Sequence, residues 1–440
     1  MIGNVRQSYI KKCAIYNTFN RAVTIHGVHH LTIMNNVAYN NMGHTFFVED
    51  GFETHNHLEG NVAFSTQRSW SLLMTDQTPA SFWITNPSNK FINNRACGSA
   101  RYGFWFDFPD SGKPGGPSAA LGAHMCIHGM ELGEWTDNVV HSNGRYGLRI
   151  FHVLIPLANP CLSYYDSSAA DPWSTNPPVT ANFNGLIGYK NIRDAATAER
   201  IGDVRWNNFK AVDNKFAALE MTYAQYSKPW ATVGIFNALV VGYSNNNQSL
   251  DTASHTPNNP GAFGIITSQT DGMLVDNIKF VNIGADQYPF ATESHSENDC
   301  SRDWGGRIHN ISNITWMDVS PNKKVYWKTP KRDVLKLVDS TYSGAPGYLA
   351  TVLPHLISDD CIDETDTYNS ILCNNNVVIK RVMFYNQTPW NDFYFKNVNV
   401  RRTSGTGHLM QDVEVEDPNN STLTITVQEI TPTALVMTKN

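Results

Sequence analysis

Acidic and histidine side chains gather in residues 43–57, which read GHTFFVEDGFETHNH. The members of this group are His44, Glu49, Asp50, Glu53, His55 and His57. Carboxylate oxygens are the ligands that calcium prefers, and a pair of carboxyl groups is also what acid–base cleavage of a glycosidic bond requires. The stretch therefore predicts either a calcium site formed by Glu49, Asp50 and Glu53 or a catalytic site that adds His44 to them. The histidines can also supply a base or ligands for a transition metal.

A structural alternative is a solvated acidic turn. In an extended strand Glu49 and Glu53 share one face while Asp50 points to the other, but the Asp50-Gly51 pair indicates a turn that could bring all three together. The spacing matches no zinc signature or calcium loop that we recognise. We therefore favour an acidic turn with hydrogen-bonded histidines over a chemical site.

The tripeptide Arg-Tyr-Gly occurs twice, in the segments RYGFWFDF and RYGLRIFH. Both copies fall at the same position of a repeat, so we expect them to stack in neighbouring coils. A guanidinium beside an aromatic ring suits the carboxylate and the ring face of a sugar acid, which makes Arg101, Tyr102, Arg145 and Tyr146 candidate carbohydrate-binding residues. Pairing of these arginines with Asp107 or with a turn carboxylate explains the repetition equally well, and we favour it.

Other histidines and tryptophans of this region are interpreted as structural. Trp83 and Trp105 are expected to fill the interior of the coils together with nearby phenylalanines. The histidines expected at corners or in the core are His26, His29, His30, His141 and His152. The sequence contains no glycine-rich phosphate loop and no nucleophile–histidine signature, which argues against nucleotide chemistry.

A short apolar run led by a polar residue recurs through the first half of the chain. The segments CAIYN, NVAYN, NVAFS, NRACG and NVVHS start 23, 25, 33 and 44 residues apart, and second runs such as AVTI, TFFV, YGFWF and YGLRI follow. Short β-type runs at a period in the twenties, with insertions between them, are typical of a β-solenoid. Asparagine at a corner tolerates left-handed backbone geometry and can bond a neighbouring coil. We therefore expect Asn36, Asn61, Asn94 and Asn138 to occupy equivalent corners of successive coils.

The fold that this repeat predicts is an all-β parallel β-helix over residues 1–321. Long insertions are expected near 65–90, 109–130 and 156–180. Residues 322–440 contain longer alternating segments and are predicted to form a β-rich part that packs on the solenoid or continues it. The best helix candidate is NIRDAATAERIG, around residue 195. A β-sandwich is the competing all-β fold, but it requires shorter and more regular turn spacing.

Composition limits the classes of partner. The net charge of −6 gives no basic surface for nucleic acid, so we expect no nucleic-acid partner. No run approaches the 18 or so apolar residues of a transmembrane helix, so no membrane span is expected in this segment. Charged residues amount to only 16%, which suits a β-rich extracellular protein.

Sequons and cysteines indicate a secretory route. The sequons lie at Asn247, Asn310, Asn313, Asn386, Asn419 and Asn420. Of seven cysteines, Cys126 and Cys161 flank one loop and Cys361 and Cys373 another, so each pair is a candidate disulfide. Reduced buried cysteines are the alternative. We interpret the chain as a segment of a larger secreted or membrane-anchored polypeptide.

Four motifs in order give the chain a family resemblance: GHTFFVEDG, DQTPASFWITNPSN, GSARYGFWFDF and HSNGRYGLRIFH. They resemble the β-helix of fibrocystin-like proteins, a group that includes the cell-migration-inducing hyaluronan-binding protein and the transmembrane hyaluronidase. The resemblance runs over residues 10–155 and continues more thinly to about residue 390. It implies a right-handed parallel β-helix in a large cell-surface protein. The hyaluronidase branch implies calcium-dependent cleavage of a polysaccharide, whereas the fibrocystin-like branch, which the longer motifs match better, implies no established reaction.

Three functional hypotheses follow. The first, which we favour, is a non-catalytic, glycosylated structural or adhesive segment at the cell surface. Its partners would be neighbouring copies or other segments of the same large protein, and glycans, because open coil ends expose sheet edges that can support a coat or filament. The second is a calcium-dependent hydrolase that degrades hyaluronan or a similar polysaccharide with the acidic stretch; calcium is the one cofactor that the sequence suggests. The third is a carbohydrate-binding module without turnover.

Overall fold

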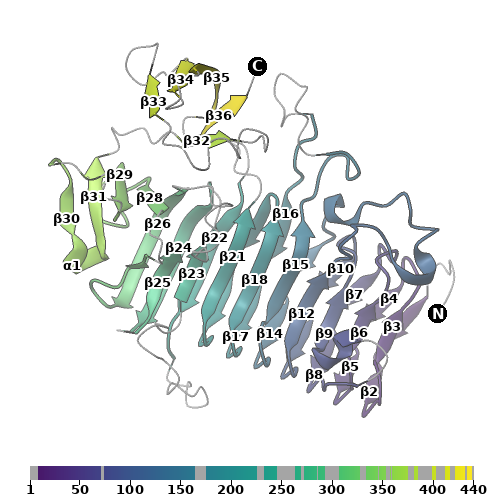
Figure 1. The fold of residues 1–440 in the computed structure, drawn as a ribbon. Coiled ribbons are helices and arrows are strands. Elements are labelled where there is room, and N and C mark those ends of the chain that lie inside the picture. The colour runs from purple at the N-terminus through teal and green to yellow at the C-terminus, as the bar shows by residue number, and fades with distance from the viewer. Residues whose placement is uncertain are drawn as a thin grey trace.

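The computed structural model describes residues 8–70, 74–163, 175–224, 232–244, 263–268, 272–284, 286–292, 307–327, 333–344, 346–352, 357, 359–374, 381–384, 399–402, 412–416, 422–431 and 434–438. Strands dominate this part of the chain, and nearly all pairings up to residue 337 are parallel and in register. Figure 1 shows the strands of successive coils side by side along one axis, from the purple N-terminal coils to the green ones. The predicted parallel β-helix is therefore confirmed.

Each of the first seven coils contributes three short strands. The first strands of these coils are β1 (Tyr9–Lys11), β4 (Thr32–Met34), β7 (His57–Glu59), β10 (Lys90–Ile92), β13 (Trp135–Thr136), β16 (Ala181–Asn184) and β19 (Val204–Asn207). The second strands are β2 (Ala14–Tyr16), β5 (Val37–Tyr39), β8 (Val62–Phe64), β11 (Arg95–Cys97), β14 (Val139–His141), β17 (Ile187–Tyr189) and β20 (Lys210–Val212). These second strands coincide with the repeated segments that begin with CAIYN.

The third strands form a separate sheet of ten strands. They are β3 (Val23–Ile25), β6 (Phe46–Val48), β9 (Ala80–Ile84), β12 (Tyr102–Asp107), β15 (Leu148–Leu154), β18 (Asp194–Ile201), β21 (Ala217–Ala224), β23 (Phe263–Thr267), β25 (Tyr288–Thr292) and β27 (Val325–Tyr326). Farther along the axis, long strands replace the first and second strands of a coil: β22 (Gly234–Val241), β24 (Leu274–Ile283) and β26 (Arg307–Val319).

The chain changes character after β28 (Asp333–Leu337), which still pairs in parallel with β26. The antiparallel strands β29 (Tyr348–Thr351), β30 (Ile362–Glu364) and β31 (Ser370–Asn374) follow, with the short helix α1 (Thr365–Tyr368). A five-stranded sheet comprises β32 (Arg381–Phe384), β33 (Asn399–Arg402), β34 (Asp412–Glu416), β35 (Thr422–Thr431) and β36 (Ala434–Thr438). The division that we predicted between residues 321 and 322 stays a prediction.

The interior of the helix is filled by ladders of identical or similar side chains. The Phe46 and Phe82 rings stack with centroids 4.9 Å apart, and Phe82 stacks on Phe104 at 4.4 Å. At one corner Asn36, Asn61, Asn94 and Asn138 form a fully buried row of hydrogen-bonded amides, as predicted. The sequence analysis missed a second buried row, in which Asn143 bonds Asn191 and Asn191 bonds Asn214.

Two sequence-based expectations were wrong. Residues around 195 form strand β18, not a helix, because the solenoid interior requires small side chains there: Ala195, Ala196 and Ala198 are all fully buried. Trp83 and Trp105 do not line the interior. They pack with Phe47 in a separate cluster on the other face of the third-strand sheet, where strand alternation places them.

Longer insertions separate some of the strands. They include the short 3-10 helices η1 (Met74–Gln77), η2 (Gly116–Ser118) and η3 (Ile127–Gly129). Cys126 forms a disulfide with Cys161, and Cys361 with Cys373, so both predicted pairs are confirmed. Cys13 and Cys97 are free thiols. Among the described residues, no helix is long and apolar enough to cross a membrane.

Candidate functional site

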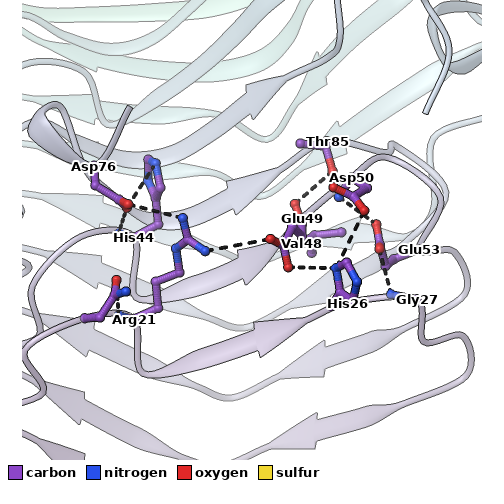
Figure 2. Close-up of polar contacts among 11 residues, drawn as sticks. Arg21, His26, Gly27, His44, Val48, Glu49, Asp50, Glu53, Asp76 and Thr85 are labelled. Carbon is purple, nitrogen blue, oxygen red and sulfur yellow. Dashed lines mark hydrogen bonds and ion pairs between the residues drawn. The ribbon is translucent and has the colours of Figure 1, made fainter. Parts of the chain in front are cut away.

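The acidic stretch begins where β6 ends, at the exit of the second coil's third strand. Glu49 and Asp50 follow Val48 directly, and the chain then turns at Gly51, whose φ of +85° is the left-handed geometry that glycine adopts without strain. Figure 2 shows that this turn brings the side chains of Glu49, Asp50 and Glu53 near one another. The predicted turn is therefore present.

Glu53 is used to hold the turn and the preceding coil. Its side chain is fully buried, and its Oε1 accepts a hydrogen bond from the Gly27 amide at 2.9 Å. Its Oε2 accepts from the amides of Asp50 and Gly51, each at 3.1 Å. Burial raises the pKa of Glu53, and backbone hydrogen bonds, including those from the Gly27 and Asp50 amides, oppose that rise. Both carboxylate oxygens thus have backbone partners.

Glu49 and Asp50 instead face His26, a residue of the first coil. His26 Nδ1 lies 2.9 Å from Glu49 Oε2 and 3.6 Å from Asp50 Oδ2. One ligand atom from each of the three residues lies within 4.8 Å of the other two. The sequence analysis assigned His26 to a corner and missed this contact. The signal was the repeat itself, since Ile25 pairs with Val48 and so places His26 beside Glu49.

His44 belongs to a neighbouring buried network. Its Nδ1 accepts the Ala80 amide at 3.0 Å, its own amide donates to Asp76 Oδ1 at 3.1 Å, and its ring is fully buried. Burial lowers the pKa of His44 to about 3, which keeps the ring neutral. Arg21 links this network to the acidic turn, because its guanidinium lies 3.1 Å from Asp76 Oδ2 and 3.9 Å from Glu49 Oε1 (Figure 2).

The remaining histidines of the stretch lie elsewhere. The His55 ring stacks on the His30 ring at 5.1 Å, and His57 Nε2 lies 3.0 Å from Glu59 on β7. Of the six side chains grouped by the sequence, the turn therefore gathers only Glu49, Asp50 and Glu53, and it adds His26.

The two Arg-Tyr-Gly copies do stack in neighbouring coils. The rings of Tyr102 and Tyr146 are parallel with centroids 5.8 Å apart, and both side chains are buried. Arg145 Nη1 lies 3.5 Å from the Tyr102 hydroxyl and its guanidinium lies 5.0 Å from the Tyr146 ring. Arg101 is half-buried, and its Nε has no hydrogen-bond partner. The tyrosine faces are thus occupied by the protein itself.

The cation near Asp107 is Arg149, which the sequence analysis did not single out. Its guanidinium lies 4.0 Å from the Phe151 ring and its Nη2 bonds Glu199 at 2.7 Å. Burial raises the pKa of Asp107 to about 7, although Arg149 acts in the opposite direction. This group is another place where titratable side chains meet on the third-strand sheet.

Two predicted glycosylation sites fall within the described residues. Asn310 and Asn313 both lie on β26; Asn313 is exposed and Asn310 is half-buried. The other sequons, Asn247, Asn386, Asn419 and Asn420, lie outside the described residues.

Comparison with known proteins places the chain among β-helix relatives. Residues 1–148 match the family model described as CEMIP beta-helix. Fibrocystin-L of Mus musculus is 32% identical over 403 residues, which are 88% of this chain and 9% of that protein. The resemblance inferred from the four motifs is therefore confirmed. The chain corresponds to about a tenth of the relative's length.

The other relatives are matched over less of the chain. The human cell migration-inducing and hyaluronan-binding protein is 32% identical over 47% of this chain and 17% of its own length. The human cell surface hyaluronidase CEMIP2 is 29% identical over 56% of the chain and 20% of its own length. Among solved structures, the surface adhesin PfbA of Streptococcus pneumoniae is 8% identical, with a TM-score of 0.37 over 84% of this chain and 79% of that one. A structural likeness this distant supports no further inference.

Proposed function

Because this chain is homologous to fibrocystin-L and its residues 1–148 are a CEMIP β-helix domain, we propose that it is a non-catalytic structural or adhesive segment of a cell-surface protein. The proposal rests on the observation that carboxylates of the acidic turn are engaged in hydrogen bonds and ion pairs within the protein. Glu53 accepts three backbone amides, and Glu49 lies between Arg21 and His26. A general acid or nucleophile must instead be free to reach its substrate.

His44 supports the same proposal. A catalytic base needs access to substrate and a pKa near the working pH, whereas the His44 ring is fully buried with a pKa of about 3. Its Nδ1 already accepts a backbone amide. His44 and Asp76 therefore act as an anchor that fixes the insertion before β9 to the second coil.

An extracellular setting fits the covalent chemistry of the chain. The Cys126–Cys161 disulfide closes an insertion, and the Cys361–Cys373 disulfide joins the residue before β30 to β31. Structural disulfides persist in secreted and cell-surface proteins, where thiols are not kept reduced. The partners would be neighbouring copies or other segments of the same large polypeptide, which can stack on the open coil ends.

The test is an assay of hyaluronan chain length by viscosity and gel mobility, with calcium present and with a known hyaluronidase as positive control. The native segment and the variants Glu49→Gln and Asp50→Asn are expected to leave the polymer intact. Glu134→Gln, an exposed acidic position, serves as the matched variant. Calcium-dependent shortening by the native segment that Glu49→Gln or Asp50→Asn abolishes, while Glu134→Gln retains it, would establish a hydrolase instead.

Saccharide binding without turnover is a second candidate, favoured by an open groove of about 550 Å³. Its lining includes the amides of Asn17, Asn40 and Gln67, with Phe19 and Arg68. The Phe19 ring is 89% exposed, unlike the tyrosines of the Arg-Tyr-Gly copies. An exposed ring, a guanidinium and several amides are groups that bind a sugar acid.

Calorimetry with hyaluronan oligosaccharides tests this second candidate. Phe19→Ala and Arg68→Ala are each expected to weaken binding about tenfold, equivalent to about 1.4 kcal/mol. Tyr16→Ala is the control, because Tyr16 is 67% exposed and lies outside the groove lining. Equal affinity of all three variants, or no binding by the native segment, would remove the groove as the site.

A further inference from the structure

The group formed by His26, Glu49 and Asp50 has the geometry of a metal-binding site. Metal–ligand bonds of about 2.0–2.2 Å place neighbouring ligand atoms roughly 3–3.5 Å apart. His26 Nδ1 is 2.9 Å from Glu49 Oε2 and 3.6 Å from Asp50 Oδ2, close to this spacing. All three donor atoms lie within 4.8 Å of one another, so small side-chain rotations would close the set around one ion.

An unpaired buried carboxylate oxygen is a second indication. His26 Nδ1 and Asp50 Oδ2 are both shielded from solvent, and the Asp50 side chain is only 11% exposed. Asp50 Oδ2 has no hydrogen-bond partner, whereas His26 Nδ1 makes its short contact, at 2.9 Å, with Glu49 Oε2. A proton on Nδ1 can be directed to Glu49 or to Asp50 but does not serve both. A buried carboxylate oxygen without a partner lowers the stability of the fold, because it has lost its hydration without gaining a hydrogen bond. A cation bound between the three groups would remove this free-energy cost.

The donor set selects the class of metal. An imidazole nitrogen with two carboxylates suits borderline metals such as Zn²⁺ and Mn²⁺, whereas calcium takes six to eight oxygens. The calcium site predicted from the sequence relied on Glu53, but both oxygens of that carboxylate accept backbone amides. In the part of the chain that the structure describes, two carboxylates then remain beside His26, which is too few for a typical calcium site.

We propose that His26, Glu49 and Asp50 bind one divalent transition-metal ion, of the Zn²⁺ or Mn²⁺ class, which crosslinks the first two coils. His26 follows β3 in the first coil, whereas Glu49 and Asp50 follow β6 in the second. The 109–130 insertion is held at the same place, because the Gly115 amide donates to the Asp50 carbonyl at 2.9 Å. A Cβ atom at Gly116 would lie 2.7 Å from Asp50 Oδ1, so the insertion leaves room for nothing larger than glycine there.

The experiment measures metal binding directly on the whole chain after dialysis against a chelator. Calorimetry with ZnCl₂ or MnCl₂ alone is expected to show that one Zn²⁺ or Mn²⁺ ion binds per chain. Calorimetry with CaCl₂ alone is expected to show an affinity for calcium that is at least tenfold weaker. Addition of Co²⁺ should give visible absorption bands of a coordinated ion. His26→Gln, Glu49→Gln and Asp50→Asn should each weaken Zn²⁺ binding at least tenfold.

The matched control is His57→Gln. His57 and Glu59 form a similar pair at 3.0 Å, but no third His, Cys, Asp or Glu of the described residues completes a group with them, so this variant should bind Zn²⁺ like the native chain. Circular dichroism checks that each variant is folded, and the native chain's stoichiometry does not depend on any variant. Absence of one-to-one binding by the native chain, unchanged affinity of the folded His26→Gln and Asp50→Asn variants, or preference for calcium would each refute the site.

The result of the metal-binding experiment can be distinguished from the result of the hyaluronan assay that tests the proposed function. Metal binding without hyaluronan cleavage supports both proposals. Cleavage that requires Zn²⁺ would overturn the non-catalytic role and leave the metal site standing.

Discussion

The side-chain amide of Asn61 donates a hydrogen bond to the side-chain oxygen of Asn94 at 3.0 Å, although 33 residues separate the two. The same oxygen also accepts the Asn61 backbone amide, and Asn61 Nδ2 donates its other hydrogen to the Ile33 carbonyl. Asn36 and Asn94 repeat this pattern toward the next coil. The row satisfies buried backbone groups where each coil turns, and it fixes how successive coils stack.

Asn61→Ala should therefore destabilise the β-helix. The substitution removes the acceptor of the Asn36 backbone amide and the donor to Ile33, and each buried unpaired group costs about 1–3 kcal/mol. Denaturant unfolding should show a midpoint well below that of the native chain. Asn182→Ala is the control, because Asn182 is an exposed asparagine on β16 and its loss should change little. Equal midpoints of the two variants would show that the row contributes no stability.

Asp107 should make stability fall as the pH rises. Its pKa is about 7 in the folded chain against an ordinary 3.8, so between these values the unfolded state loses the proton first and becomes relatively more favourable. The contribution is complete below about pH 4 and lost by about pH 7. Thermal unfolding of Asp107→Asn should match the native chain at pH 4 and exceed it at pH 8.

Asp366→Asn provides the comparison for this pH effect. Asp366 is exposed in α1, so its replacement should shift the midpoint equally at both pH values. A loss of stability in Asp107→Asn at pH 8 would mean that attraction between Asp107 and Arg149 outweighs the cost of burying the carboxylate.

The Cys126–Cys161 disulfide should protect the 109–130 insertion. It closes a loop of 35 residues, for which chain-entropy arguments give a stabilisation of about 4 kcal/mol. The double variant Cys126→Ser/Cys161→Ser should be cleaved by protease within 109–130 faster than the native chain. The variant Cys361→Ser/Cys373→Ser should leave cleavage in that region unchanged. Equal cleavage of all three proteins would show that packing, not the disulfide, holds the insertion.

The solenoid could be predicted from sequence because its stabilising contacts repeat. Asn36, Asn61, Asn94 and Asn138 lead each second strand, so the corner row is visible as a letter pattern. The alanines of β18 did not indicate a strand in the sequence, because alanine also favours helices. Their role here depends on close contact between neighbouring parts of the coil, which the sequence does not show. A Cβ at Gly188 would lie 2.4 Å from the Ala195 Cβ, which shows how tightly the coil closes at that point.

The candidate site was predictable only in part. Glu49, Asp50 and Glu53 are close in sequence, so their proximity followed from the turn at Gly51. The different roles of these carboxylates depend on groups from other coils that local spacing does not reveal. His26 precedes Glu49 by 23 positions in the sequence, and Asp76 accepts a hydrogen bond from Arg21, which lies 55 positions before it. Only the register of the repeat, applied coil against coil, would have brought His26 to the acidic turn.

Glycosylation should occur at Asn313 in preference to Asn310. Both are sequons on β26, but Asn313 is exposed at a left-handed corner with φ of +53°, whereas Asn310 is half-buried between Leu274 and Lys336 of the adjacent strands. Asn313 Nδ2 donates to Asp276 Oδ1 at 2.7 Å and keeps one hydrogen for that contact after a glycan is attached. The two sites are three residues apart, so a glycan on one would hinder attachment at the other.

The measurement is peptide mass spectrometry of the chain secreted from a glycosylating host, with and without glycosidase. Asn313→Gln should abolish the glycan on the peptide that contains both sequons, and Asn310→Gln should retain it. Thr315→Ala, which removes the Asn313 sequon but keeps the asparagine, should act like Asn313→Gln because the oligosaccharide transfer requires the hydroxyl residue. A glycan that survives Thr315→Ala but not Asn310→Gln would mean that modification precedes strand formation and ignores the exposure of the folded chain.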